Sequence, residues 1–109
     1  MLLHGFWSLL EVMSASPAPL PFTSAVAGVS FYQEVVVPTS VGDDLLAVAV
    51  EDNEHDPKAV EVRIARTGEV LGFIPGKIAP RLRATGQQAW ECVVTEVLRG
   101  DLTGLRIKV

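Results

Sequence analysis

The sequence contains one cysteine, two histidines and few aromatic residues. The single cysteine, Cys92, excludes an internal disulfide and any zinc site built on cysteines, and it fits a reducing, cytoplasmic compartment. Aromatic residues make up 6% of the chain and apolar residues 49%, so Val, Leu, Ile and Ala must fill most of the core. With 109 residues, the chain is long enough for one small domain.

Positive charge is missing from the first half of the chain. Residues 1–57 hold eight of the thirteen acidic residues and no Lys or Arg, whereas residues 58–109 hold all nine basic residues. The net charge of −4 argues against strong non-specific binding to DNA, which depends on neutralising phosphates. A local basic face built from the second half stays open as an alternative.

The first residues of the chain lack the features of a targeting or membrane segment. No Lys or Arg precedes the apolar start, and His4 and Glu11 interrupt it, so neither a signal peptide nor a membrane span is predicted. Apolar residues recur at helical spacing up to Met13, which favours a short amphipathic helix before a flexible linker. The alternative is that translation starts at Met13. We therefore separate a tail, residues 1–24, from a domain, residues 25–109.

The domain is patterned mostly as β-strands. Residues 59–65 alternate strictly between apolar and charged side chains, which is typical of a half-buried strand. Gly68 marks a hairpin turn, and the Pro- and Gly-rich residues 75–86 indicate a short helix. The other predicted strands are residues 24–32, 44–51, 69–74, 89–98 and 105–109. About six short strands with one or two helical turns predict an all-β fold, either a small barrel or a curled sheet.

The stretch "EDNEHDPKAVEV", residues 51–62, is crowded with groups that could bind a ligand. As a calcium loop it fails, because Pro57 stands where a Gly is required and Arg63 where a Glu is required. Too few His and Cys residues are present for a transition-metal site. Cys92 falls on the same strand face as Trp90, which is typical of a core residue. We therefore predict no metal, no cofactor and no catalytic centre.

Three segments resemble the HIRAN domain family in content and order. That family has a glycine-containing first strand ending in aromatic residues, a D-N-x-x-D-x-x-A-V loop and strand, and a G-x-x-x-G-[YFH]-[IL]-P hairpin leading into a helix. The matching segments here are "VAGVSFY" (26–32), "DNEHDPKAVEV" (52–62) and "GEVLGFIPGKIAPRL" (68–82). The resemblance covers residues 25–109 and implies a small OB-like β-barrel with two short helices. Composition and length indicate a stand-alone, bacterial member.

The resemblance implies a DNA-binding module and not an enzyme. In helicase-linked members the domain captures the 3′ end of single-stranded DNA, which implies a role in DNA repair or at replication forks, as a monomer beside a helicase or nuclease. Such a site needs an acceptor for the 3′-hydroxyl, apolar faces for the last bases and donors for the phosphates. The alternative is a protein-interaction module that keeps the barrel and has lost DNA-end binding.

The resemblance assigns these roles to particular residues. Asp56 matches the acidic residue that accepts the 3′-hydroxyl, and Asn53 matches a loop Asn that donates to a phosphate or braces the loop. Phe31 matches the first-strand aromatic residue that packs on the terminal base. His55 stands where helicase-linked members carry a second stacking Tyr, and Phe73 follows the hairpin glycine at a contact position.

The predicted phosphate contacts depart from the family pattern. Ser30 stands where helicase-linked members carry an Arg. Lys77 lies one residue beyond the place of a helix-start Lys, which Gly76 occupies. Lys58 and Arg81 are further candidates for phosphate contact. Fewer cationic contacts predict weaker and less salt-sensitive binding.

The binding residues also have structural interpretations. Asp56 before Pro57 is a good turn former, because Asp can bond its own backbone and Pro fixes φ. Phe31 and Phe73 are of a type that more often lies in a core. The basic residues of the second half form a solvated face by default, and Tyr32 is expected to point away from Phe31.

Overall fold

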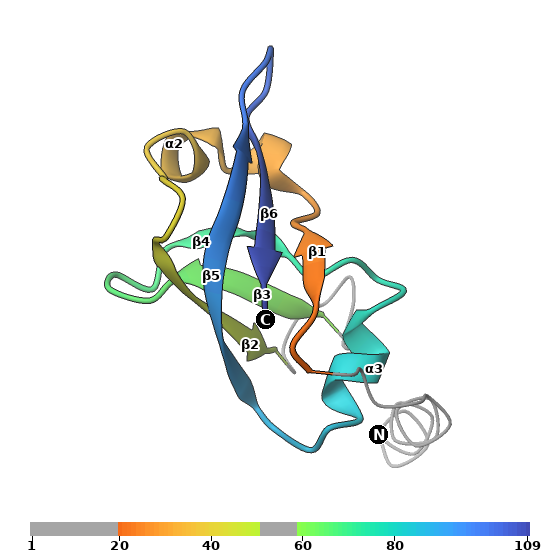
Figure 1. Ribbon diagram of the computed structural model, residues 1–109. Coiled ribbons are helices and arrows are strands. Elements are labelled where there is room, and N and C mark those ends of the chain that lie inside the picture. Colours follow the sequence, from red (N-terminus) through yellow and green to blue (C-terminus); the bar gives the residue numbers. More distant parts are fainter. Residues whose placement is uncertain (1–19, 51–58) are drawn as a thin grey trace.

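The computed structural model describes residues 20–50 and 59–109 (Figure 1). The strand segments coincide with the alternating or apolar segments of the sequence, and the two short helices and the 3₁₀-helix lie between them. In chain order the elements are β1 (Thr23–Ala25), the 3₁₀-helix η1 (Val29–Phe31), α2 (Gln33–Val36), β2 (Asp44–Ala49), β3 (Val60–Ile64), β4 (Val70–Phe73), α3 (Ala79–Arg83), β5 (Ala89–Leu98) and β6 (Gly104–Lys108).

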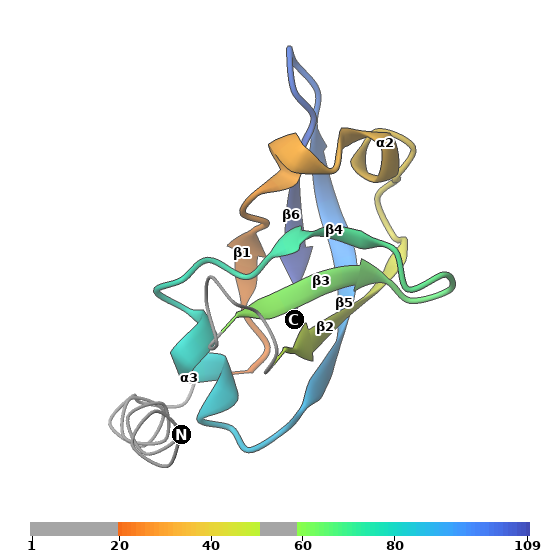
Figure 2. The same ribbon diagram turned by 180° about the vertical axis from the view of Figure 1, so that it is seen from behind.

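All strands of the described part form one antiparallel sheet, in the order β1-β6-β5-β2-β3-β4. The sheet curls into a half-barrel, and an isolated bridge joins Ala27, two residues beyond the edge strand β1, to Phe73 at the end of the other edge strand, β4. Figure 2 shows η1 and α2 at one end of the half-barrel and α3 at the other, with the end of β4 between them. The predicted all-β, OB-like architecture with two short helices is confirmed.

The core lies inside this curl and is built by the inward-facing side of each strand. In β3, Val60 and Val62 are fully buried, as strict alternation predicts. In β5, Trp90, Cys92 and Val94 share the buried face, and the Trp90 Nε1–H donates to Thr85 Oγ1 at 3.2 Å. Burial in this apolar face raises the pKa of the Cys92 thiol to about 11. Cys92 is therefore a packed core residue.

The prediction of one strand over residues 24–32 is wrong beyond its first part. Strand β1 ends at Ala25, and Gly28 adopts a left-handed conformation with φ of 75°. The chain then tightens into η1, where the Phe31 N–H donates to the Gly28 carbonyl at 3.1 Å. A glycine in the left-handed conformation cannot continue the hydrogen-bond ladder of a strand. The two aromatic residues that follow, Phe31 and Tyr32, therefore lie at the end of a 3₁₀-turn and not on a strand. The start of the strand also differs by one residue, because β1 begins at Thr23 and the predicted strand at residue 24.

The position of helix α2 was not predicted, because two of its four residues, Val35 and Val36, are β-branched and favour strands. A distant contact holds it in place. The Gln33 side chain donates to the carbonyls of Val29 and Thr103, both at 2.9 Å, and accepts the Thr103 N–H at 2.8 Å. Within residues 20–50 and 59–109, no helix has the length and apolar character to span a membrane.

Candidate nucleic-acid interface

Phe31 is the most exposed large apolar side chain of the described residues. It ends η1 and keeps 83% of its surface accessible, so a core position is excluded. Ser30 is exposed beside it on the same turn. Tyr32, in contrast, packs against the core, so the two neighbouring aromatic side chains have different environments. An aromatic face held in solvent by a tight turn is available to stack on a base.

Phe73 lies at the end of β4, next to the turn that carries Phe31. Its backbone exchanges two hydrogen bonds with Ala27, of 2.7 and 2.8 Å. Its ring contacts the Tyr32 ring at a centroid distance of 6.2 Å and a tilt of 59°. Phe73 pairs with Glu61 in register, and directly opposed residues of an antiparallel ladder share a face. The ring is therefore half-buried on the outer face of the sheet.

The two hairpin glycines of the sequence motif serve different physical needs. Gly68 sits in the β3–β4 turn with φ of 80°, a conformation that favours glycine. At Gly72 the reason is space: a Cβ would overlap the Ala27 carbonyl oxygen and lie 2.7 Å from Val26 Cγ1. Because the backbones approach so closely there, the strand edges can join and bring Phe73 beside Gly28.

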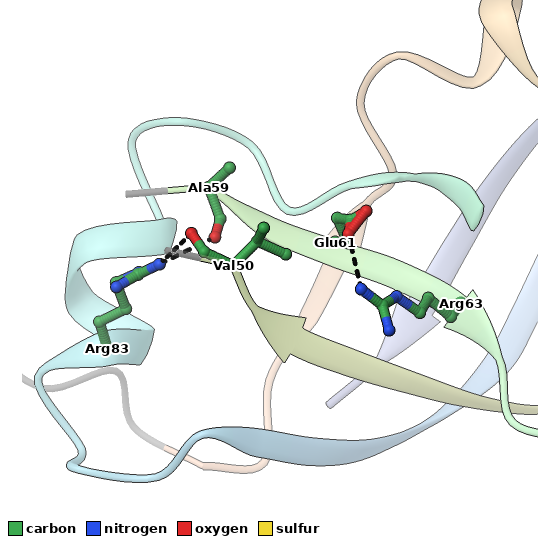
Figure 3. Close-up of polar contacts among 5 residues, drawn as sticks. All are labelled: Val50, Ala59, Glu61, Arg63 and Arg83. Atoms are coloured by element: carbon green, nitrogen blue, oxygen red, sulfur yellow. Dashed lines mark hydrogen bonds and ion pairs between the residues drawn. The ribbon is translucent and has the colours of Figure 1, made fainter. Parts of the chain in front are cut away.

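The cation on β3, the strand that pairs with β4, is already in an ion pair. Arg63 and Glu61 are two residues apart on β3, and their side chains form an ion pair of 2.7 Å (Figure 3). The pair is largely shielded, since 33% of the Arg63 side chain and 16% of the Glu61 side chain are accessible. Arg63 therefore contributes little free positive charge to this face.

Val50 and Ala59, the described residues on either side of 51–58, lie beside α3. Val50 follows β2 and Ala59 precedes β3, and the Val50 N–H donates to the Ala59 carbonyl at 3.0 Å. Arg83 Nη2 donates to both the Val50 and Ala59 carbonyls (Figure 3). The predicted site residues of this segment lie outside the described residues; they are Asn53, His55, Asp56 and Lys58.

Lys77 and Arg81 lie on the α3 side of Phe73. Lys77 is exposed in the connection between β4 and α3, and Arg81 is exposed on α3 itself. The helix begins where the Ala79 N–H donates to the Pro75 carbonyl at 3.0 Å, and Pro80 occupies its first turn, as expected. The described candidates thus divide into Ser30 and Phe31 on η1, Phe73 in between, and the two cations beyond it.

A cleft of about 650 Å³ opens elsewhere, between α2, the start of β2 and the β3–β4 hairpin. Four carboxylates line it against one cation; the charged residues are Glu34, Asp43, Asp44, Glu69 and Arg66. This excess of negative charge repels phosphates, so the cleft is not the place for a nucleic acid. In the part of the chain that the structure describes, no group of three or more His, Cys, Asp or Glu could hold a metal ion.

An antiparallel half-barrel with an exposed aromatic side chain at one rim is the construction of a small β-barrel binding module. The family model of the HIRAN domain matches residues 21–98, so the chain belongs to the HIRAN domain family. The HIRAN domain is a nucleic-acid-binding module. No curated protein and no solved structure matches the chain significantly.

Arg83 was not singled out from the sequence, where it was grouped with the solvated basic residues. One signal was available, since a basic residue in the last turn of a helix can bond to free carbonyls. That signal predicts hydrogen bonds from Arg83 to carbonyls of its own helix. The actual acceptors belong to residues 33 and 24 positions earlier in the chain, and only the fold brings them to α3.

Proposed function

We propose that this HIRAN domain binds the 3′ end of single-stranded DNA. Phe31 carries the proposal, because a Phe that is 83% exposed on a fixed turn offers an open face to the terminal base. Phe73 extends the apolar surface on the neighbouring strand, and Lys77 lies further along the same path. A single strand that crosses these residues runs from η1 toward α3.

The polar contacts of the proposal follow the family resemblance. Asp56 accepts the 3′-hydroxyl, Asn53 donates to a phosphate or braces its own segment, and His55 supplies a second, smaller stacking face. Cationic or hydroxyl contacts to the phosphates come from Ser30, Lys58, Lys77 and Arg81. With so few cations, each phosphate contact contributes a large share of the electrostatic affinity.

In this proposal the chain binds DNA and has no catalytic step of its own. It acts in the cytoplasm as a monomer, and the unwinding or cleavage of DNA in repair or at replication forks belongs to a helicase or nuclease beside it. The 3′-hydroxyl is the chemical mark by which the domain recognises an end, and a carboxylate oxygen is a suitable acceptor for its O–H.

Fluorescence anisotropy tests the proposal with two labelled oligonucleotides that differ only at the 3′ end, one with a hydroxyl and one with a phosphate. We expect tighter binding of the hydroxyl end, because a terminal phosphate places two like charges beside Asp56. Asp56→Ala should remove the difference. Asp101→Ala, which removes the same charge from the exposed β5–β6 turn, should keep it. Equal affinity of the unmodified protein for both ends contradicts the proposal.

A protein-interaction module is the second candidate function. The Glu61–Arg63 pair favours it, since it neutralises the cation on the strand beside Phe73. Binding of neither oligonucleotide at low salt, where phosphate contacts are strongest, would leave this candidate in place of DNA-end binding.

A further inference from the structure

The direction of the Phe31 side chain is set by the backbone and not by packing. Because 83% of its surface is accessible, core contacts cannot fix the ring. Two backbone hydrogen bonds shape the turn that carries it. The Phe31 N–H donates to the Gly28 carbonyl at 3.1 Å, and the Tyr32 N–H donates to the Val29 carbonyl at 3.0 Å. The contacts that hold η1 in place therefore also decide where Phe31 presents its face.

The side-chain amide of Gln33 ties η1 to the β5–β6 hairpin. Its Nε2 donates to the carbonyls of Val29, the first residue of η1, and of Thr103, both at 2.9 Å. Its Oε1 accepts the Thr103 N–H at 2.8 Å. Figure 1 shows η1 and α2 on either side of this hairpin. The three bonds need a carbonyl oxygen and an NH₂ group on one side chain, which only Gln and Asn offer.

The chain is anchored to the same hairpin on both sides of Phe31. Before the turn, the Val26 N–H donates to the Leu105 carbonyl of β6 at 3.0 Å. After the turn, Gln33 bonds to Thr103, which directly precedes β6 and is 6% exposed. The first anchor is made by backbone alone, whereas the second depends on the Gln33 side chain. Removing the Gln33 amide therefore frees one end of the turn and leaves the hydrogen bonds of the sheet in place.

We infer that Gln33 is a positioning residue for the stacking of Phe31 on a DNA base. The inference rests on the proposed function, in which Phe31 supplies the stacking face. By fixing η1 before DNA arrives, Gln33 removes the cost of ordering the turn on binding. Its loss should weaken the binding of single-stranded DNA. Because Gln33 is neutral, the dependence of affinity on salt concentration should stay unchanged.

A double-mutant cycle separates positioning from a merely structural role. Gln33→Met keeps a side chain of similar length without the amide, and it is made in the unmodified protein and in Phe31→Ala. Anisotropy at low salt with the 3′-hydroxyl oligonucleotide measures affinity. We expect a loss of about fivefold in the unmodified protein, the lower limit of what one stacked base contributes. In Phe31→Ala the loss should be below about twofold, because no ring is left to position.

Two control variants lie at the other end of the half-barrel, beside α3. Gln87→Met is the same replacement at an exposed residue, whose Nε2 reaches only the Ala89 carbonyl, at 3.5 Å. Thr85→Val removes a hydroxyl that donates to the Leu82 carbonyl at 2.7 Å and accepts the Trp90 Nε1–H at 3.2 Å. Thr85→Val should lower the free energy of unfolding. Both folded controls should bind DNA with unmodified affinity.

Hydrogen exchange gives a second measurement that does not depend on DNA. The Thr103 amide, whose acceptor is Gln33 Oε1, should exchange faster in Gln33→Met and at the unmodified rate in Gln87→Met. An unchanged rate in Gln33→Met overturns the inference.

The binding data can overturn the inference in two further ways. Either unmodified affinity in Gln33→Met or an equal loss in both backgrounds does so. If Gln33→Met does not fold, Gln33→Asn, whose amide sits on a side chain shorter by one methylene, is judged by the same criteria. Unmodified affinity in Phe31→Ala instead contradicts the stacking role in the proposed function.

Discussion

Replacing Gly72 by Ala tests the closure of the half-barrel. The new Cβ would overlap the Ala27 carbonyl oxygen and lie 2.7 Å from Val26 Cγ1. Neither neighbour can easily move away. Val26 is 6% exposed in the core, and Ala27 is held by two backbone hydrogen bonds to Phe73. The substitution must therefore either open the bridge between the two sheet edges or displace a core side chain.

Both routes have a similar cost. Opening the bridge loses two backbone hydrogen bonds at about 1 kcal/mol each, and overpacking of a core typically costs about 1–3 kcal/mol. Lower conformational entropy of the unfolded chain offsets about 0.4–1 kcal/mol for a Gly→Ala change. We expect Gly72→Ala to lower the free energy of unfolding by about 1–2 kcal/mol, a sizeable part of the roughly 5–15 kcal/mol of a small domain.

Urea unfolding monitored by Trp fluorescence measures this loss. The matched control is Gly76→Ala, because nothing lies within 4 Å of a Cβ at Gly76 and its φ is not positive. The control should be as stable as the unmodified protein or more stable by up to about 1 kcal/mol, because only the unfolded-chain entropy changes. Equal stability of the two variants would refute the conclusion that close backbone approach at Gly72 joins the sheet edges.

Two further predictions concern an exposed and a buried side chain. Phe31→Ala should leave the free energy of unfolding, measured with urea, within about 0.5 kcal/mol of the unmodified value. The same change should weaken binding of single-stranded DNA, measured by anisotropy, by about 1–3 kcal/mol. Unaltered affinity would contradict a stacking role. Cys92 keeps its proton up to a pKa of about 11 in the folded state against an ordinary value of 9.0, so unfolding becomes easier as the pH rises between these values. Urea unfolding at pH 8 and pH 11 should show that the free energy of unfolding falls by roughly 2–3 kcal/mol between the two pH values, and Cys92→Ala should lack this loss. An equal loss in both proteins would contradict the prediction.

The parts of the fold that follow from local pattern were predictable. Strict alternation identified β3, and Gly68 identified its hairpin turn, because a period of two and a positive φ leave few other interpretations. Segment 24–32 was misjudged, since Gly28 reads equally well as a strand glycine and as a left-handed turn. Helix α2 depends on Gln33 contacts to Thr103, 70 residues away, and no local pattern encodes such a contact.

The candidate site was predictable as a set of residues and not as an arrangement. The resemblance pointed to Phe31 and Phe73, but the exposure of Phe31 follows from the 3₁₀-turn that the sequence did not predict. The ion pair between Arg63 and Glu61 depends on how the two side chains are oriented on β3, which the sequence alone does not give. The acceptors of Arg83 become neighbours only when α3 packs beside the ends of β2 and β3.

The location of DNA on the half-barrel can be measured directly by NMR titration of the isotope-labelled protein. With an oligonucleotide bearing a free 3′-hydroxyl, we predict the largest amide shifts at residues 30–32, at Phe73 and at Lys77, with smaller shifts when the 3′ end is phosphorylated. Shifts concentrated at Asp43, Asp44 and the rest of the acidic cleft, or identical shifts for both ends, would contradict end recognition at the Phe31 rim.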